Sequence, residues 1–205
     1  EPRKPRTEER SVLVASGGDP VAGLAVRSAY GPEGARVEVL TDLTGLPGRL
    51  LGDRGASANV LHLWGVAVFD PAASRVGEPE LLLSSENPES IDRERPRLSG
   101  SDVLSLDLKG SLVLLWLDHR PLPAVAEPTA WRDLAACWLA AGAESVVVSL
   151  WDPPADSFPA FTAELHRALS QNLAPAEALS QARRLLSARP QTADPVHWSG
   201  YVLYK

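Results

Sequence analysis

Short apolar runs alternate with longer amphipathic stretches along most of the chain. The runs are continuous rather than alternating, which is typical of strands buried on both faces of a parallel sheet. Residues 111–117 and 145–151 are the most apolar of them. The expected strands cover residues 11–16, 36–40, 59–64, 111–117, 145–151 and 198–203, with a small hairpin arm at 81–83.

Apolar residues that recur every three to four positions predict helices between these strands. The two clearest lie at 157–169 and 175–187, and the second has a proline in its first turn. Their inward faces are expected to hold Phe158, Phe161, Leu165 and Leu169 in the first, and Leu179, Ala182, Leu185 and Leu186 in the second. Further helices are predicted at 21–30, at 44–54, at 99–106 with Ser99 or Ser101 as its cap, and at 129–141. The alternation favours an α/β sandwich with a mainly parallel sheet.

The composition narrows the class of protein. A chain of 205 residues, 44% hydrophobic and 22% charged, can bury a sizeable core. No apolar run approaches the roughly 20 residues of a membrane-spanning helix, so we expect no membrane partner. A net charge of −6 disfavours a nucleic-acid partner. The single cysteine allows neither an internal disulfide nor a thiolate zinc site, and we expect a reducing, cytoplasmic setting.

The N-terminal residues differ in character from the rest. Residues 1–10 carry four basic and three acidic side chains and almost nothing to bury, which predicts a linker or disordered tail. A single globular domain is expected over 11–205, with a charged loop at 86–97. The chain contains no methionine, which indicates a part of a longer protein.

Several blocks of sequence, in order, resemble the CHAT domain, a caspase-like domain related to separase that often follows tetratricopeptide repeats. These blocks are residues 98–115, 139–151, 174–179 and 197–203. The resemblance implies a caspase-like three-layer sandwich, with a central, mainly parallel sheet of about six strands flanked by helices.

The resemblance also implies a cysteine–histidine dyad, each member just past the carboxyl end of a central strand. The family's histidine pattern, similar to LHFATHGVFD, matches LHLWGVAVFD at 61–70 without a gap and places Val66 at the histidine. The cysteine pattern, similar to LVVLSACETG, matches LVLLWLDH at 112–119 and places Asp118 at the nucleophile. Valine transfers no proton, and a carboxylate opposes a developing oxyanion. We therefore expect no catalytic residues at this degenerate dyad, and a pseudoprotease rather than an enzyme.

Two other sets of residues could replace the dyad. Cys137 lies on the helix expected at 129–141 among apolar neighbours, with no cation at helical spacing to lower its pKa, so a buried structural thiol is expected. Asp118, His119 and Asp70 could form a metal or general-base cluster at the sheet end. Adjacent strand residues point to opposite faces, however, and no second histidine stands at ligand spacing, so no metal or other cofactor is predicted.

The remaining histidines are expected to have structural or solvated roles. His62 shares a strand face with Trp64 and is expected to be an interior imidazole. His166, beside Arg167, is expected on a helix surface, and His197 belongs to the closing block of the resemblance.

Two tryptophans stand near the dyad positions. Trp64 and Trp116 each precede a dyad position by two residues and so share its strand face. They could fill the family's substrate cleft, line a new binding surface, or merely compensate for volume lost nearby. A buried indole also needs an acceptor for its N–H, and Asp118 could serve.

These inferences predict a catalytically inactive CHAT-like domain that serves as a protein-interaction or regulatory module of a longer protein. Its partner would be another protein or other domains of the same chain, such as the tetratricopeptide repeats that the resemblance implies. The candidate interaction surface comprises Trp64, Phe69, Trp116, Asp118, His119 and Arg120. The alternative is an active caspase-like cysteine peptidase with a non-standard or misaligned active site, and a third possibility is a metal hydrolase using Asp118 and His119.

Overall fold

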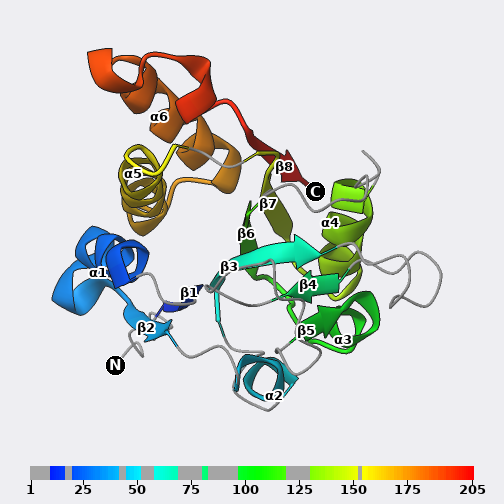
Figure 1. The fold of residues 1–205 in the computed structure, drawn as a ribbon. Helices are drawn as coiled ribbons and strands as arrows, with labels where there is room; N and C mark the ends of the chain where they lie inside the picture. The colour runs from blue at the N-terminus through cyan, green and yellow to red at the C-terminus, as the bar shows by residue number, and fades with distance from the viewer. Residues whose placement is uncertain are drawn as a thin grey trace, which may run out of the picture.

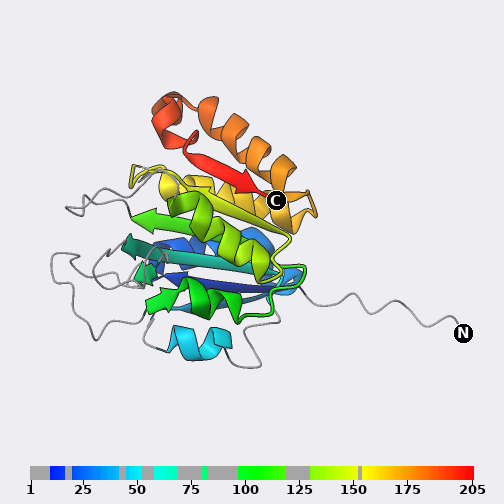
Figure 2. The same ribbon diagram turned by 90° about the vertical axis from the view of Figure 1, so that its right-hand side faces the viewer.

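A central sheet with helices on both faces forms the body of the domain (Figure 1, Figure 2). The structure, a computed structural model, describes residues 10–16, 20–41, 45–51, 58–68, 80–82, 97–118, 130–151 and 154–205. Six strands follow the order β2-β1-β3-β6-β7-β8, and off this path the short strand β4 pairs with β3 and the short strand β5 pairs with β4. Their bounds are β1 Ser11–Ser16, β2 Arg36–Leu40, β3 Val60–Val68, β4 Glu80–Leu82, β5 Arg97–Ser99, β6 Leu112–Asp118, β7 Ser145–Ser149 and β8 Tyr201–Tyr204.

The strand directions confirm the predicted fold class. The first five strands of the main path pair in parallel, and β8 closes it antiparallel to β7. The short strands β4 and β5 add an antiparallel extension at the end of β3. This is an α/β sandwich with a mainly parallel sheet of six strands, consistent with a caspase-like fold.

The helices divide between the two faces of the sheet. The helices are α1 Pro20–Gly34, α2 Leu46–Leu51, α3 Gly100–Leu104, α4 Ala130–Ala140, α5 Phe158–Ser170 and α6 Pro175–Ser187, and two short 3₁₀ helices lie at Pro190–Thr192 and Pro195–His197. Helices α2, α3 and α4 pack with the sheet in a first core, and α1, α5 and α6 pack with it in a second core. Alternate residues of one strand enter different cores, which explains the continuous apolar runs.

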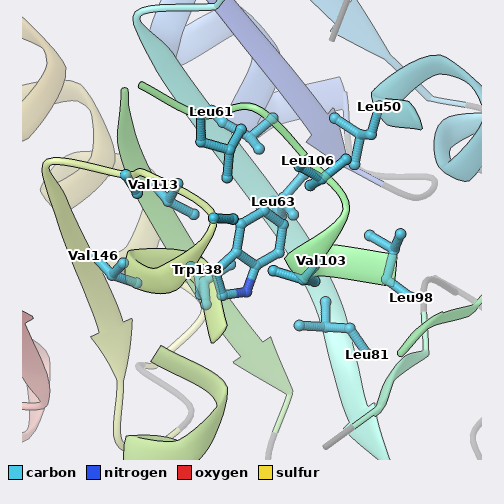
Figure 3. Close-up of a cluster of buried hydrophobic side chains, with 14 of the residues drawn as sticks. Leu50, Leu61, Leu63, Leu81, Leu98, Val103, Leu106, Val113, Trp138 and Val146 are labelled. Atoms are coloured by element: carbon cyan, nitrogen blue, oxygen red, sulfur yellow. The ribbon is translucent and has the colours of Figure 1, made fainter. Parts of the chain in front are cut away.

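The first core is organised around one indole. Trp138 of α4 is fully buried, and Figure 3 shows its ring among the side chains of Leu63, Val103 and other apolar residues of the strands and of α3. The second core is built on β6 and the apolar face of α5, where Phe158, Phe161, Leu165 and Leu169 are all buried as the helical spacing predicts.

Most predicted elements are present, with differences at specific points. The strands at 11–16 and 36–40 and the helix at 175–187 have the predicted bounds. The predicted stop of the first helix at Gly31 corresponds to a break, since Gly31 has a φ of 68°, which glycine adopts readily. Strand β3 continues to Val68, past the predicted end at 64, and β5 begins at Arg97, inside the stretch expected to be a loop.

The inward face of α6 is partly different from the prediction. Leu185 is 39% exposed, so its expected burial is wrong, whereas Ala178 is fully buried. Residues 178, 182 and 186 are spaced four apart, and with Leu179 they form a stripe too narrow to include position 185.

Helix α3 begins with the cap that the sequence suggests. The Ser99 hydroxyl oxygen accepts from the Asp102 backbone N–H at 3.1 Å, and the Asp102 carboxylate accepts from the Ser99 backbone N–H at 2.9 Å. We expect Ser99→Ala to lower the free energy of unfolding by about 1 kcal/mol, because it leaves a helix N–H without its acceptor. Urea denaturation measures this loss. Ser101→Ala, at the exposed alternative cap position, is the control and should change stability by less than about 0.5 kcal/mol.

Candidate functional site

The two sequence positions assigned to the dyad lie opposite each other in the sheet. Strands β3 and β6 are parallel neighbours, and in their register Val66 pairs with Asp118. Both positions lie at the carboxyl ends of their strands, the edge at which parallel sheets present functional side chains. The structure describes the backbone at these positions but not the two side chains. Two separately matched sequence patterns thus converge on one pair of neighbouring backbone positions.

The tryptophans pair one step earlier in the same register. Trp64 lies opposite Trp116, again across β3 and β6. Trp116 is only 2% exposed, and its Nε1–H donates to the Thr162 hydroxyl of α5 at 3.2 Å. The expectation that Asp118 could accept this hydrogen bond is therefore wrong: the indole points into the second core, where α5 supplies the acceptor. Trp116 also lies 4.8 Å, between ring centroids, from Tyr201.

Trp64 occupies the same side of the sheet with part of its surface open. It is half-buried, and its indole meets the Phe158 ring edge to face with centroids 4.3 Å apart. Both indoles therefore fill the space between the sheet and the start of α5. The described pockets lie elsewhere, one at the amino ends of β1 and β2 and one between α1 and β2. The contacts favour volume filling for Trp116, whereas Trp64 keeps part of its surface accessible.

A buried polar chain joins three elements beneath these tryptophans. His62 Nδ1 lies 3.1 Å from His166 Nε2, and His166 Nδ1 lies 3.3 Å from the Tyr30 hydroxyl. The two imidazoles are stacked with an interplanar angle of 19°, and Trp116 packs edge-on against His62. This chain links α1 and α5 to the central strand β3.

Burial sets the charge state of both imidazoles. It lowers the pKa of His62 to about 3, and burial together with the nearby His62 lowers the pKa of His166 well below its usual value. Burial also raises the pKa of the Tyr30 hydroxyl, with Arg10 partly opposing the shift. At neutral pH all three side chains, Tyr30, His62 and His166, are uncharged. Neutral imidazoles with such low pKa values are poor bases, so these histidines are unsuited to ionise a thiol.

One histidine prediction is confirmed and one is wrong. His62 is an interior imidazole, as expected. His166 is fully buried instead of lying on a helix surface. The signal was present in the spacing, because position 166 follows the buried positions 158 and 162 by eight and four residues, and so falls on the inward stripe of α5. His197 lies in the 3₁₀ helix Pro195–His197 and is half-buried.

The single thiol lies on the other side of the sheet from Trp116. Cys137 of α4 is half-buried and packs against the first core, whereas the tryptophans and His62 face α5 on the second-core side. The described contacts therefore do not bring Cys137 together with His62 or His166, the two histidines of the buried chain.

We expect Cys137 to react with iodoacetamide more slowly in the native chain than in the chain unfolded in urea at the same pH. Partial burial against the first core restricts the access of the reagent to the sulfur. Mass spectrometry of alkylated protein against time measures both rates. A native rate above the unfolded rate would identify an activated thiolate instead.

The metal alternative gains no support from the described part of the chain. Within those residues, no group of three or more His, Cys, Asp or Glu side chains could hold a metal ion. His119 and Asp70, the other members of that cluster, lie outside the described residues, as do Phe69 and Arg120 of the candidate interaction surface.

None of the helices among residues 10–205 that the structure describes is long and apolar enough to cross a membrane.

Comparison with known proteins finds one curated relative and one protein family. The chain is 30% identical over 106 residues to human tetratricopeptide repeat protein 28, a match that covers 52% of this chain and 4% of that protein. The chain thus corresponds to a small part of that relative. The sequence profile of the CHAT domain matches residues 6–205, nearly the whole chain. By this match the chain belongs to the CHAT domain family, and its mainly parallel sheet is consistent with a caspase-like fold.

Proposed function

We propose that this domain is a catalytically inactive CHAT domain, a pseudoprotease that serves as an interaction or regulatory module within a longer protein. The observation that carries the proposal is the pairing of Val66 with Asp118 at the carboxyl ends of β3 and β6. A thiol nucleophile and its base would have to stand at neighbouring positions such as these. Asp118 has no thiol to serve as the nucleophile, and Val66 has no group that could take a proton from one.

The nearest described histidine does not replace the missing base. His62 lies on the same strand as Val66, but its Nδ1 is engaged by His166 and its pKa is about 3. A general base works best with a pKa near the operating pH, which this imidazole is far from. Cys137 packs on the opposite face of the sheet. These positions support loss of the cysteine-peptidase chemistry rather than its transfer to other residues.

The proposed role in protein interaction rests on the repeats named in the human relative. The human relative carries tetratricopeptide repeats by its name, and the chain spans only a small part of it. We therefore propose repeats of the same full-length protein as the partner. They would contact the sheet edge formed by the carboxyl ends of β3 and β6, including the exposed part of Trp64.

Site-specific photo-crosslinking in the full-length protein tests this contact. A photoreactive amino acid replaces Arg120, just past β6, in one variant. In a matched control it replaces Lys109, an exposed residue just before the opposite end of β6. We expect crosslinks to the repeats from position 120 and few from position 109. Equal yields from both positions, or none from position 120, would contradict the proposed surface.

A further inference from the structure

The strand β2 is an edge of the sheet. Among the described residues it pairs with β1 alone, and no described segment bonds the backbone groups on its second side. The Arg36 backbone N–H donates to the Arg10 carbonyl at 2.8 Å, which shows that residue 36 directs its backbone groups toward β1. Backbone groups alternate in direction along a strand, so those of Val37 and Val39 point outward.

This edge has two charged side chains of opposite sign but lacks the other features that usually block pairing. Its sequence, Arg-Val-Glu-Val-Leu, has no proline, glycine or lysine, and two β-branched residues present the outward backbone groups. An edge of this kind is a ready template for another strand. What it pairs with must match its charges, which are a cation at position 36 and an anion at position 38.

A second copy of the same strand supplies this match in one antiparallel register. When Val37 lies opposite the partner's Val37, the two outward residues form a hydrogen-bonded pair and exchange both N–H···O bonds. Ala35 then lies opposite the partner's Val39, again as an outward pair. Arg36 comes opposite the partner's Glu38 in a non-hydrogen-bonded pair, where side chains approach most closely. The register shifted by one pair instead sets Glu38 against the partner's Glu38.

We propose that this chain forms a symmetric dimer in which β2 pairs antiparallel with β2 of a second copy, centred on Val37 and joined by Arg36–Glu38 pairs across the twofold axis. Arg36 is exposed and has no ion pair among the described residues, so it is available. Glu38 bonds Arg49 of its own chain, and a carboxylate has acceptor sites for a second cation. The two central sheets become one continuous sheet.

Helix α1 extends the same interface. The twofold axis of antiparallel edge pairing is perpendicular to the sheet, so the α1 helices of both copies lie next to each other on one face. Figure 1 shows α1 beside β2 at this end of the sheet. Leu24 of α1 is 64% exposed and lines a mainly apolar hollow with Gly23, Arg27, Val39 and Thr41. An exposed leucine beside an open strand edge becomes covered in the dimer.

Sedimentation velocity of the 205-residue chain over a concentration series tests the proposal. We expect the wild type to dimerise reversibly. Arg36→Glu should weaken the dimer roughly tenfold or more, because the new carboxylate repels the partner's Glu38. The twofold symmetry places this repulsion at two sites in each dimer. The double change Arg36→Glu with Glu38→Arg restores opposite charges at both positions and should restore the dimer.

Matched leucine variants test the part that α1 plays. Leu24→Glu should weaken the dimer, whereas Leu104→Glu should leave it unchanged, since Leu104 is comparably exposed at 53% but lies on α3, on the other face. Circular dichroism and urea denaturation establish that each variant is folded. The proposal is overturned by a monomer at every concentration, by a dimer insensitive to Arg36→Glu, or by a folded charge-swapped chain that stays monomeric. None of these outcomes bears on the loss of peptidase activity.

Discussion

Replacement of Trp138 by alanine is expected to lower the free energy of unfolding by about 3–5 kcal/mol. The indole is fully buried in the first core, where strands β3, β6 and β7 and helix α3 surround it (Figure 3). Truncation removes its apolar contacts and leaves a cavity that rigid strands on several sides cannot collapse to fill. Urea denaturation followed by circular dichroism measures the loss.

Trp138→Phe is the matched control for this prediction. The Trp138 Nε1–H is buried with no acceptor among the described residues, so phenylalanine removes no hydrogen bond there. It should therefore cost less than half as much as alanine. A loss below about 1 kcal/mol for Trp138→Ala would show that this core does not organise the domain.

Acidification from pH 7 to pH 5 is expected to destabilise the domain through its buried histidines. Burial holds the pKa of His62 near 3, below the value of about 6.5 in an unfolded chain. The unfolded state therefore binds more protons, and the stabilisation present above pH 6.5 is lost as the pH falls toward 3. His62 alone accounts for about 2 kcal/mol between pH 7 and pH 5, and His166 shifts in the same direction.

Urea denaturation at pH 7, 6 and 5 measures this dependence, and His166→Gln tests its origin. Glutamine keeps a donor and an acceptor between Tyr30 and His62 but does not titrate, so the stability of this variant should fall less steeply. His197→Gln, outside the buried chain, is the control and should follow the wild type. An imidazole signal of His62 that titrates near pH 6.5 in the folded state, observed by NMR, would contradict the prediction.

The strands could be predicted because the sheet buries both of their faces. A continuous apolar run such as 111–117 can bury all its side chains as a strand covered on both faces. The alternation of such strands with helices along the chain indicated the fold class. The length of β3 was underestimated. Its last residues pair with β4 and β6, contacts from distant sequence that no local pattern reveals.

In the candidate site, too, the sequence indicated local features but not contacts between residues far apart in the chain. The resemblance implied one dyad position at the carboxyl end of each of two central strands, whereas the pairing of Val66 with Asp118 in register is seen only in the structure. The helical spacing in α5 could have indicated that His166 is buried, but not which groups it contacts. Its hydrogen-bond partners, His62 and Tyr30, come from elements more than a hundred residues away.

Peptide cleavage is the most direct test of whether this domain has lost protease chemistry. The chain is incubated with a library of peptides from a digested proteome, and new termini are identified by mass spectrometry. We predict no new termini beyond those seen with the heat-unfolded chain. New termini that disappear with Cys137→Ala would contradict the account and indicate a thiol peptidase. New termini that persist in Cys137→Ala but disappear with a chelator would contradict it in favour of a metal hydrolase.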